Sequence, residues 1–112
     1  MLKKIVSFGF RHDSPPVEPG TVLVDVRTMF RNPYYNRNLR HKRGTDPEVQ
    51  RDILKTPDFH VKYQYVKEQV TQPGTEVAYI GCTGGQHRSV FLAERLGQDL
   101  GVPVEHRDIG RE

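Results

Sequence analysis

The sequence predicts an α/β fold: a single domain, residues 1–112, with a largely parallel sheet of about four strands, flanking helices and a glycine-rich anion-binding loop after the third strand. Three observations lead to this prediction. Short, β-branched apolar runs alternate along the chain with segments of helical periodicity. A glycine-rich stretch follows the third such run and directly precedes a helical pattern. The length of 112 residues is that of one domain.

Four segments have the composition of strands. Residues 4–10 are apolar and β-rich, and a proline-rich loop at residues 11–20 ends that run. Residues 21–26 form a continuous β-branched run, which is typical of a strand covered on both faces. Residues 75–80 give the third strand, and residues 102–109, which alternate only weakly, give a short last strand.

Three helices are expected between these strands. The first begins at Asp46, an N-cap followed by proline and glutamate, and runs to about Lys55. The second covers about residues 57–69. The third follows the glycine-rich loop and ends near Gly101, a residue type that favours helix C-termini. Apolar side chains at helical spacing mark the buried faces of the second and third helices: Phe59, Tyr63, Val66 and Val70, then Val90, Ala93, Leu96 and Leu100.

Composition excludes several classes of protein. Hydrophobic residues make up 35% of the chain, charged residues 28%, and the mean hydropathy is -0.69, so a small core and a charged surface are expected. The sequence contains no long apolar run, and its amino-terminal apolar stretch is too short for a signal peptide, so we expect a cytoplasmic protein with no membrane partner. Cys82 is the single cysteine, which excludes an intrachain disulfide and a CxxC site.

We expect no metal and no cofactor. His12, His41 and His60 lack the close spacing of metal ligands, and a zinc site needs three or four convergent donors. His87 and His106 lie at or near the ends of expected strands, where a structural histidine and a functional one are equally compatible with the sequence.

The segment 27–43 is strongly basic. It holds six Lys or Arg and no acid, which leaves 11 basic against 14 acidic residues in the rest of the chain. Residues 28–44 show no clear period, so we expect an extended functional loop. Cations interleaved with aromatic rings suit a single-stranded RNA; the candidates are Arg31, Tyr34, Tyr35, Arg37, Arg40, Lys42 and Arg43. The alternatives are a loop that closes a small-ligand pocket and a simple solvated basic loop.

The sequence Gly81-Cys82-Thr83-Gly84-Gly85-Gln86-His87-Arg88-Ser89 carries the clearest chemical signal. Its glycine pair allows close approach of a ligand, and the unpaired amides of the following helix would face that ligand. Arg88 is placed to bind a phosphate with its guanidinium, while the neighbouring side chains supply further donors. We therefore predict an oxyanion site here. The alternative is a tight turn that needs glycine only for its backbone angles.

Cys82 and Arg88 also fit the spacing C-x5-R, followed by a hydroxyl at Ser89, which resembles the phosphate loop of cysteine-dependent phosphatases. In that alternative Cys82 is the nucleophile and Arg88 stabilises the transition state. Gly81 stands where those enzymes usually have histidine. Three aspartates are available as the general acid only by default: Asp13, Asp25 and Asp108. Our main expectation is therefore a binding protein with no catalytic residues.

Several motifs along the chain together resemble the C-terminal domain of the bacterial RNase adaptor RapZ. They are Ser7-Phe8-Gly9-Phe10, Asp25-Val26-Arg27, Asn32-Pro33, Leu39-Arg40 with Gly44, residues 81–90, Ala93-Glu94-Arg95-Leu96 and His106-Arg107-Asp108. This resemblance implies an α/β domain that senses glucosamine-6-phosphate, binds small regulatory RNAs and presents them to ribonuclease E, usually within a homo-oligomer.

The resemblance also implies which residues bind the ligand. They are Asp25, Arg27, Asn32, Cys82, Thr83, Gly84, Gly85, Gln86, His87, Arg88 and Ser89. This set agrees with the physical argument, because a sugar phosphate needs cations for its phosphate and polar partners for its hydroxyls and amine. The chain departs from the family in lacking its nucleotide-binding domain, the motif G-x-x-x-x-G-K-[ST] and the basic C-terminal tail, so we expect no nucleotide hydrolysis. Tyr34 stands where the family commonly has histidine, and the segment from Asp25 to Asn32 is one residue longer than usual.

Overall fold

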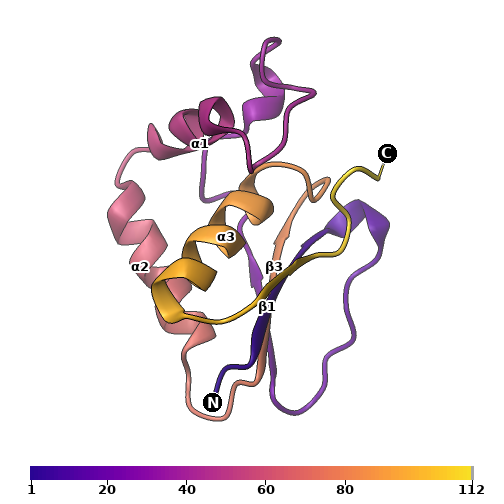
Figure 1. Ribbon diagram of the computed structural model, residues 1–112, viewed down its shortest axis with the longest axis vertical. Coiled ribbons are helices and arrows are strands. Elements are labelled where there is room, and N and C mark those ends of the chain that lie inside the picture. The colour runs from indigo at the N-terminus through magenta and orange to yellow at the C-terminus, as the bar shows by residue number, and fades with distance from the viewer. Residues whose placement is uncertain (112) are drawn as a thin grey trace.

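The computed structural model describes residues 1–111 (Figure 1). This range contains four strands and three α-helices, with two short 3₁₀ helices after the first two strands. In chain order these elements are β1 (Lys4–Gly9), η1 (Phe10–His12), β2 (Thr21–Asp25), η2 (Pro33–Tyr35), α1 (Pro47–Leu54), α2 (Phe59–Val70), β3 (Val77–Cys82), α3 (Arg88–Leu100) and β4 (Val104–His106).

The four strands form one sheet in the order β2-β3-β1-β4, and every neighbouring pair is parallel. This confirms the predicted α/β class. In the register of the sheet, Gly9 lies beside Cys82, and Asp25 lies beside Gly81. The carboxyl ends of the three longer strands therefore meet at one edge, where ligand sites of parallel sheets collect.

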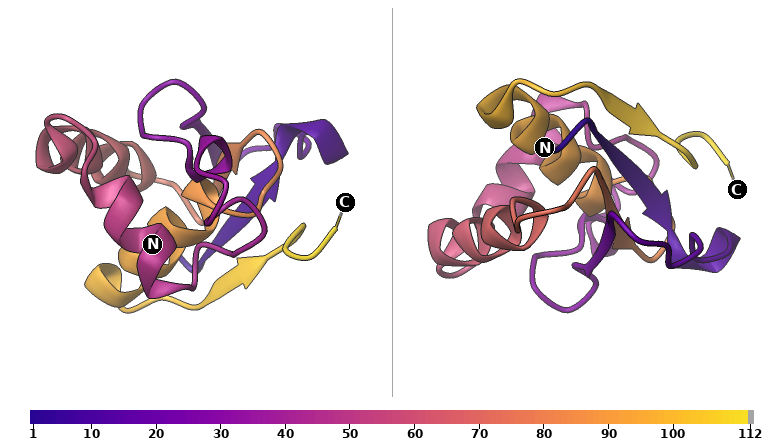
Figure 2. Two further views of the ribbon diagram at one scale, coloured as in Figure 1. Left: turned by 90° about the horizontal axis from the view of Figure 1, so that it is seen from above. Right: turned by 90° about the horizontal axis from the view of Figure 1, so that it is seen from below.

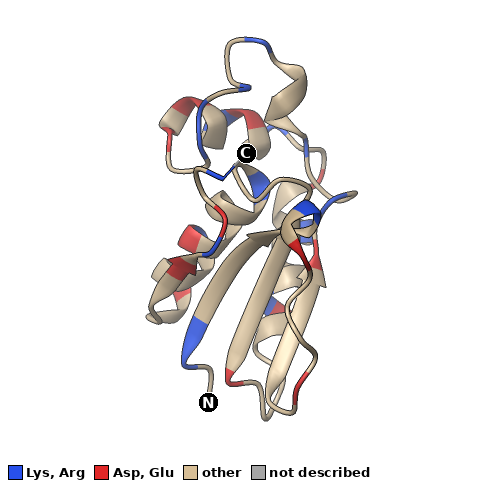
Figure 3. Cartoon of the chain, turned by 90° about the vertical axis from the view of Figure 1, so that its right-hand side faces the viewer, with Lys and Arg blue, Asp and Glu red and all other residues tan. Residues whose placement is uncertain are grey.

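The helices cover one face of the sheet, and the connection from η1 to β2 runs along the other (Figures 1 and 3). Because side chains alternate along a strand, Ile5 in β1 and Ala78 and Ile80 in β3 face the helices and belong to the main core. The predicted apolar face of α2 packs there, together with Ala93 and Leu96 of α3, and Leu100 is partly buried against the same core. Val6 and Phe8 are also buried, on the opposite face of the sheet.

Element boundaries differ from the sequence prediction where single residues intervene. The second helix begins at Phe59 rather than near residue 57, because Asp58 adopts a left-handed conformation with φ 57°. The last strand is only Val104–His106, not residues 102–109. Pro103 has no N–H for a sheet hydrogen bond, and after His106 the chain continues past the end of β4 toward the C-terminus (Figure 2).

Both helix ends that the sequence specified are confirmed. The side chain of Asp46 accepts a hydrogen bond from the N–H of Glu48 and caps α1. Gly101 ends α3 in the left-handed conformation, with φ 67°. The basic loop, residues 28–44, contains η2 and is tied to the core by the buried side chains of Phe30 and Leu39.

Candidate functional site

A pocket of about 600 Å³ opens at the carboxyl edge of the sheet. Its walls come from η1, the basic loop, the β3–α3 loop and the segment after β4. Of the residues in the range 1–111, it is lined by five arginines, two histidines and no acid: Arg11, Arg40, Arg43, Arg88, Arg111, His41 and His87. The remaining lining residues are Asn32, Tyr34, Tyr35, Cys82, Thr83, Gly84 and Gln86. Such a lining attracts an anion.

The floor of the pocket is the β3–α3 loop, which rests directly on the end of β1. Gly85 has φ 75°, and a Cβ there would lie 2.7 Å from the backbone nitrogen of Gly9. A Cβ on Gly9 would lie 2.4 Å from the carbonyl carbon of Gly84. Only glycine fits at either position, so the loop needs both residues for this close packing.

The loop leads straight into the amino terminus of α3. The N-cap residue, His87, makes no side-chain hydrogen bond to the first turn. The first amides of a helix have no partner within it and carry its positive dipole end. The predicted combination of a strand, a glycine turn and an open helix start is therefore present.

Arg88 is held rigidly at this helix start. Its side chain is 4% exposed, its Nη1 donates to the backbone carbonyl of Arg27 at 2.5 Å, and its Nη2 lies 3.4 Å from Thr83 Oγ1. Burial lowers the pKa of Arg88 from its usual value. Its Nε is buried without a hydrogen-bond partner among the described residues. Such a donor needs an acceptor to offset its desolvation.

His87 is the second buried group with an unsatisfied nitrogen. Its side chain is 7% exposed, and its Nε2 has no partner in the part of the chain that the structure describes. Burial lowers the pKa of His87, and the backbone carbonyls of Lys42 and Arg40 oppose this shift. The imidazole is therefore neutral at pH 7. A phosphate oxygen at the loop would accept hydrogen bonds from Arg88 and from a protonated His87.

Cys82 is the last residue of β3 and lies under the loop. Its Sγ is 3.1 Å from Ser89 Oγ, and the pair is buried. Cys82 contributes to the pocket lining, whereas Ser89 lies behind it, fully buried. The structure thus brings Cys82 and Arg88 to one pocket and keeps Ser89 outside its lining.

Gln86 serves a different role from the phosphate donor expected at this position. Its Nε2 donates to the backbone carbonyls of Gly84, Asp108 and Arg111, at 3.1, 2.8 and 2.9 Å. Its Oε1 accepts from the N–H of Gly110 at 2.8 Å. The side chain of Gln86 therefore fastens the segment after β4 to the loop, and in this arrangement its hydrogen-bonding capacity is used within the protein.

Asp108 also holds the segment after β4 in place. It is fully buried, and its carboxylate accepts from the N–H of Gly9 at 2.8 Å and pairs with Arg107 and Arg111. Burial acts to raise the pKa of Asp108, but the hydrogen bonds from Arg107, Gly9 and Arg111 outweigh it and lower the net pKa. The carboxylate is therefore ionised at neutral pH and fixes Arg111 beside the pocket.

Asp25 and Arg27 form an exposed pair at the end of β2, outside the lining of the pocket. Arg27 Nη2 lies 2.8 Å from Asp25 Oδ2, and its guanidinium stacks 3.9 Å from the ring centroid of Phe10. The hydrogen bond from Arg27 lowers the pKa of Asp25. Asn32, which does line the pocket, uses its Oδ1 to accept from the N–H of Tyr34.

The cations and rings of the basic loop have different surroundings in the folded protein. Arg31 pairs with the buried Asp52 at 3.1 Å, and Lys42 pairs with Glu48 at 3.1 Å, so acids of α1 neutralise two of the predicted RNA-binding cations. Four other members of the predicted set line the pocket: Tyr34, Tyr35, Arg40 and Arg43. Arg37 is exposed and lies outside the lining. The acid-free stretch of sequence is therefore not one uniform patch in space.

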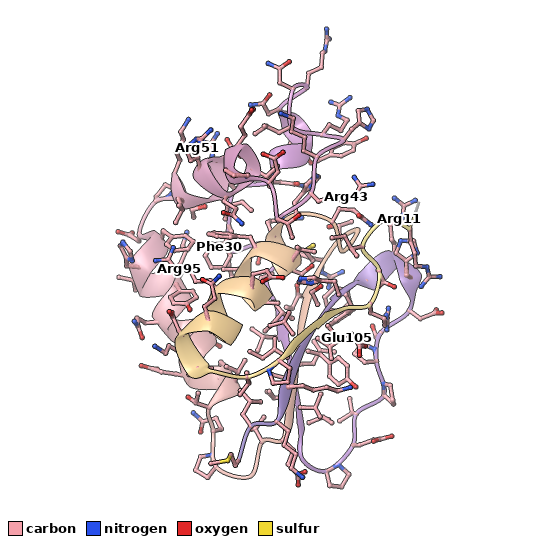
Figure 4. All side chains as sticks on the ribbon, in the orientation of Figure 1. Arg11, Phe30, Arg43, Arg51, Arg95 and Glu105 are labelled. Carbon is pink, nitrogen blue, oxygen red and sulfur yellow. The ribbon has the colours of Figure 1, made fainter. Side chains whose placement is uncertain are left out.

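Sequence reasoning missed Arg11, His41 and Arg111. Arg11 follows β1 directly, so the rule that ligand sites lie beyond strand ends was a usable signal for it. Arg111 gave no such signal, because its place at the pocket depends on the hydrogen bonds that hold the segment after β4 beside Gln86. Figure 4 shows Arg11 and Arg43 at the same end of the molecule, although they lie far apart in the sequence.

Within residues 1–111, no helix is long and apolar enough to span a membrane. No group of three or more potential metal-ligating side chains occurs in the same range.

Comparison with known proteins gives one consistent result. The family model of the RapZ C-terminal domain matches residues 1–110. Proteins described as nucleotide-binding proteins from Agathobacter rectalis, Pediococcus pentosaceus and Synechococcus sp. (strain JA-3-3Ab) are 37%, 38% and 40% identical to the chain over 96%, 94% and 92% of its length. The match covers only 41%, 39% and 33% of those relatives, so this chain corresponds to less than half of each.

Proposed function

The chain belongs to the RapZ C-terminal domain family, and on this premise we propose that it binds a phosphorylated amino sugar, such as glucosamine-6-phosphate, in the arginine-lined pocket. The observation that carries the proposal is the pair of buried, unpartnered nitrogens, Arg88 Nε and His87 Nε2, in a pocket whose described lining contains no acid. Buried polar atoms without a hydrogen-bond partner are rare in folded proteins. An anion would accept from Arg88 Nε and, once the imidazole is protonated, from His87 Nε2.

The phosphate binds at the β3–α3 loop. The amides at the start of α3 and the backbone of Thr83 and Gly84 approach its oxygens, and Arg88 supplies the charge. The loop does not have to reorganise, because Gly9 and Gly85 already fix it against β1. A preformed site loses little conformational entropy on binding.

The sugar ring extends from the loop toward Asn32, and the amine reaches beyond the pocket lining to Asp25 at the end of β2. The carboxylate of Asp25 is ionised at neutral pH because Arg27 lowers its pKa. It lies at the strand end beside Gly81, next to the phosphate loop. An ammonium group of the ligand would compete with Arg27 for this carboxylate, and a hydroxyl would do so less well.

Calorimetric titration tests this proposal directly. We expect glucosamine-6-phosphate to bind more tightly than glucose-6-phosphate, which lacks the amine, and both to bind more tightly than inorganic phosphate. At 100 times its dissociation constant, a ligand adds about 2.7 kcal/mol to the free energy of unfolding, which raises the melting temperature of a domain this small by roughly 10 °C. Absence of binding by all three compounds would refute the proposal.

The phosphatase alternative receives less support from the geometry. Catalysis there needs a protonated acid near the leaving group. Arg27 lowers the pKa of Asp25, and the partners of Asp108 lower its pKa, so both carboxylates are ionised at neutral pH. Of the three named aspartates, only Asp13 has no such ion pair among the described residues.

A second function, RNA binding, is favoured by the rings at the mouth of the pocket. Tyr35 is 82% exposed and Tyr34 is 52% exposed, and Arg37 lies close to them in the chain. Exposed aromatic rings beside cations are typical of surfaces that bind single-stranded RNA. We propose that this surface, Tyr34, Tyr35 and Arg37, contacts RNA, and that the chain acts as an adaptor in the way the family resemblance implies. Assembly into a homo-oligomer and delivery of RNA to a ribonuclease belong to the same proposal.

A further inference from the structure

We propose that the pocket contains a second anion subsite at its rim, formed by Arg11, Arg43 and Arg111, and that its best ligands therefore carry two phosphoryl groups. This inference rests on the proposed function, because it takes the β3–α3 loop as the subsite for the first phosphate. It adds a ligand class that the loop alone does not specify.

The rim subsite is assembled from three distant segments. Arg11 comes from η1, Arg43 from the end of the basic loop and Arg111 from the segment after β4, and all three line the same pocket. Three guanidinium groups around one opening repel each other unless an anion lies between them. Their convergence from separate segments is therefore a feature that a bound anion would stabilise.

Two of the three arginines have hydrogen-bond partners among the described residues. Arg111 Nη1 pairs with Asp108 Oδ1 at 2.8 Å, and the backbone carbonyl of Arg111 accepts from Gln86 Nε2 at 2.9 Å. Arg43 Nη1 donates to the carbonyl of His41 at 3.0 Å. These contacts leave other donors of each guanidinium free for a ligand. A site whose cations are already positioned loses less entropy on binding.

The charge of the lining exceeds what one phosphate neutralises. A sugar monophosphate carries about two negative charges at pH 7. Arg88 and the amides at the start of α3 meet that charge at the loop. Arg11, Arg40 and Arg43 then remain in the lining, and none of the three forms an ion pair with an acid within residues 1–111. A second phosphoryl group on the same ligand would match them.

The test compares two ligands that differ only in the second phosphate. Glucosamine-6-phosphate and glucosamine-1,6-bisphosphate are titrated into the protein by calorimetry at one salt concentration. We expect the bisphosphate to bind at least about tenfold more tightly. The reason is that its second phosphate can accept charge-assisted hydrogen bonds from the rim arginines, and such bonds are stronger than neutral ones. Arg11→Gln and Arg43→Gln should each lower the ratio of the two affinities about threefold or more.

Arg51→Gln is the matched control. Arg51 is an exposed arginine on α1, outside the pocket (Figure 4), and its replacement removes the same charge from the same chain. We expect an unchanged ratio of affinities in this variant. Equal affinities for the two ligands in the unmodified protein, or an equal fall of the ratio in Arg51→Gln, would overturn the rim subsite while leaving the proposed function standing. Failure of both ligands to bind would overturn both.

Discussion

The guanidinium of Arg88 donates through Nη1 to the backbone carbonyl of Arg27, which lies 61 residues earlier in the chain. This hydrogen bond joins the start of α3 to the segment after β2. It fixes the direction of the guanidinium, so that the N–H of Nε and one N–H of Nη2 remain available to a ligand. The residue that provides most of the charge at the loop is therefore also part of the framework that shapes it.

Replacing this guanidinium tests the site most directly. Arg88→Gln should weaken binding of glucosamine-6-phosphate by roughly 30-fold, because a hydrogen bond to a charged group contributes about 2 kcal/mol. Arg88→Lys should recover only part of the affinity, since an ammonium group keeps the charge but not the forked geometry. Calorimetry measures the affinities, and a circular dichroism melt of each variant checks that it folds. Unchanged affinity in a folded Arg88→Gln protein would exclude the loop as the phosphate site.

Cys82→Ser separates binding from catalysis. We expect it to change the affinity for glucosamine-6-phosphate less than about threefold, because a thiol is only a weak hydrogen-bonding group. We also expect no release of inorganic phosphate from this sugar phosphate by the unmodified protein, as followed by a colorimetric phosphate assay. Phosphate release that disappears in Cys82→Ser would establish the phosphatase alternative instead.

The loop and the helix after it could be predicted because their signals are local. The β-branched run before Cys82, the glycine pair and the apolar stripe of α3 are all visible within about twenty residues of sequence. The cap of α1 at Asp46 is equally local. Such features depend on backbone angles and on short-range hydrogen bonds, which sequence specifies well.

The rest of the site depends on contacts between distant residues. The stretch 27–43 contains no acid, yet Arg31 and Lys42 meet Asp52 and Glu48 once α1 packs beside the loop. Arg111 reaches the pocket only because Asp108 pairs with it and Gln86 holds the segment. Neither relationship leaves a periodic or compositional trace in the sequence.

Asp108 should be the carboxylate on which stability depends most. Asp108→Asn leaves Arg107 without its buried partner and should lower the free energy of unfolding by about 3 kcal/mol, which corresponds to a fall in melting temperature of roughly 12 °C. The pKa of Asp108 is lowered on folding. Its contribution is therefore present above the unfolded pKa of about 4 and is lost as the pH falls through the folded value. Thermal melts of both proteins at pH 7 and pH 3 measure the two effects. If the melting temperature of Asp108→Asn at pH 7 lay within about 3 °C of that of the unmodified protein, the assigned role would be contradicted.

Charge reversal at Arg37 tests RNA binding apart from the sugar phosphate site. Arg37 is exposed and outside the pocket lining, so Arg37→Glu should weaken binding of a single-stranded RNA severalfold and reduce the slope of affinity against salt concentration. Arg51→Glu, an equal charge reversal on α1, is the control. Fluorescence anisotropy at two salt concentrations provides the measurement. Equal losses in the two variants would mean that the RNA responds only to net charge and does not use the surface around Tyr34 and Tyr35.

Proton uptake on ligand binding should report on His87. Burial lowers the pKa of His87 below its usual 6.5. Just below that pH, the folded state of the free protein therefore binds fewer protons than the unfolded state. The free energy of unfolding consequently falls as the pH drops through this window. A phosphate beside Nε2 reverses the sign, because it raises the pKa and favours the charged ring. We therefore expect binding at about pH 6 to take up a proton, measured by calorimetry in two buffers of different ionisation enthalpy. His87→Asn should abolish most of this uptake, whereas His60→Asn, an exposed position on α2, should leave it unchanged. Equal uptake in the protein and in His87→Asn would place the phosphate away from this imidazole.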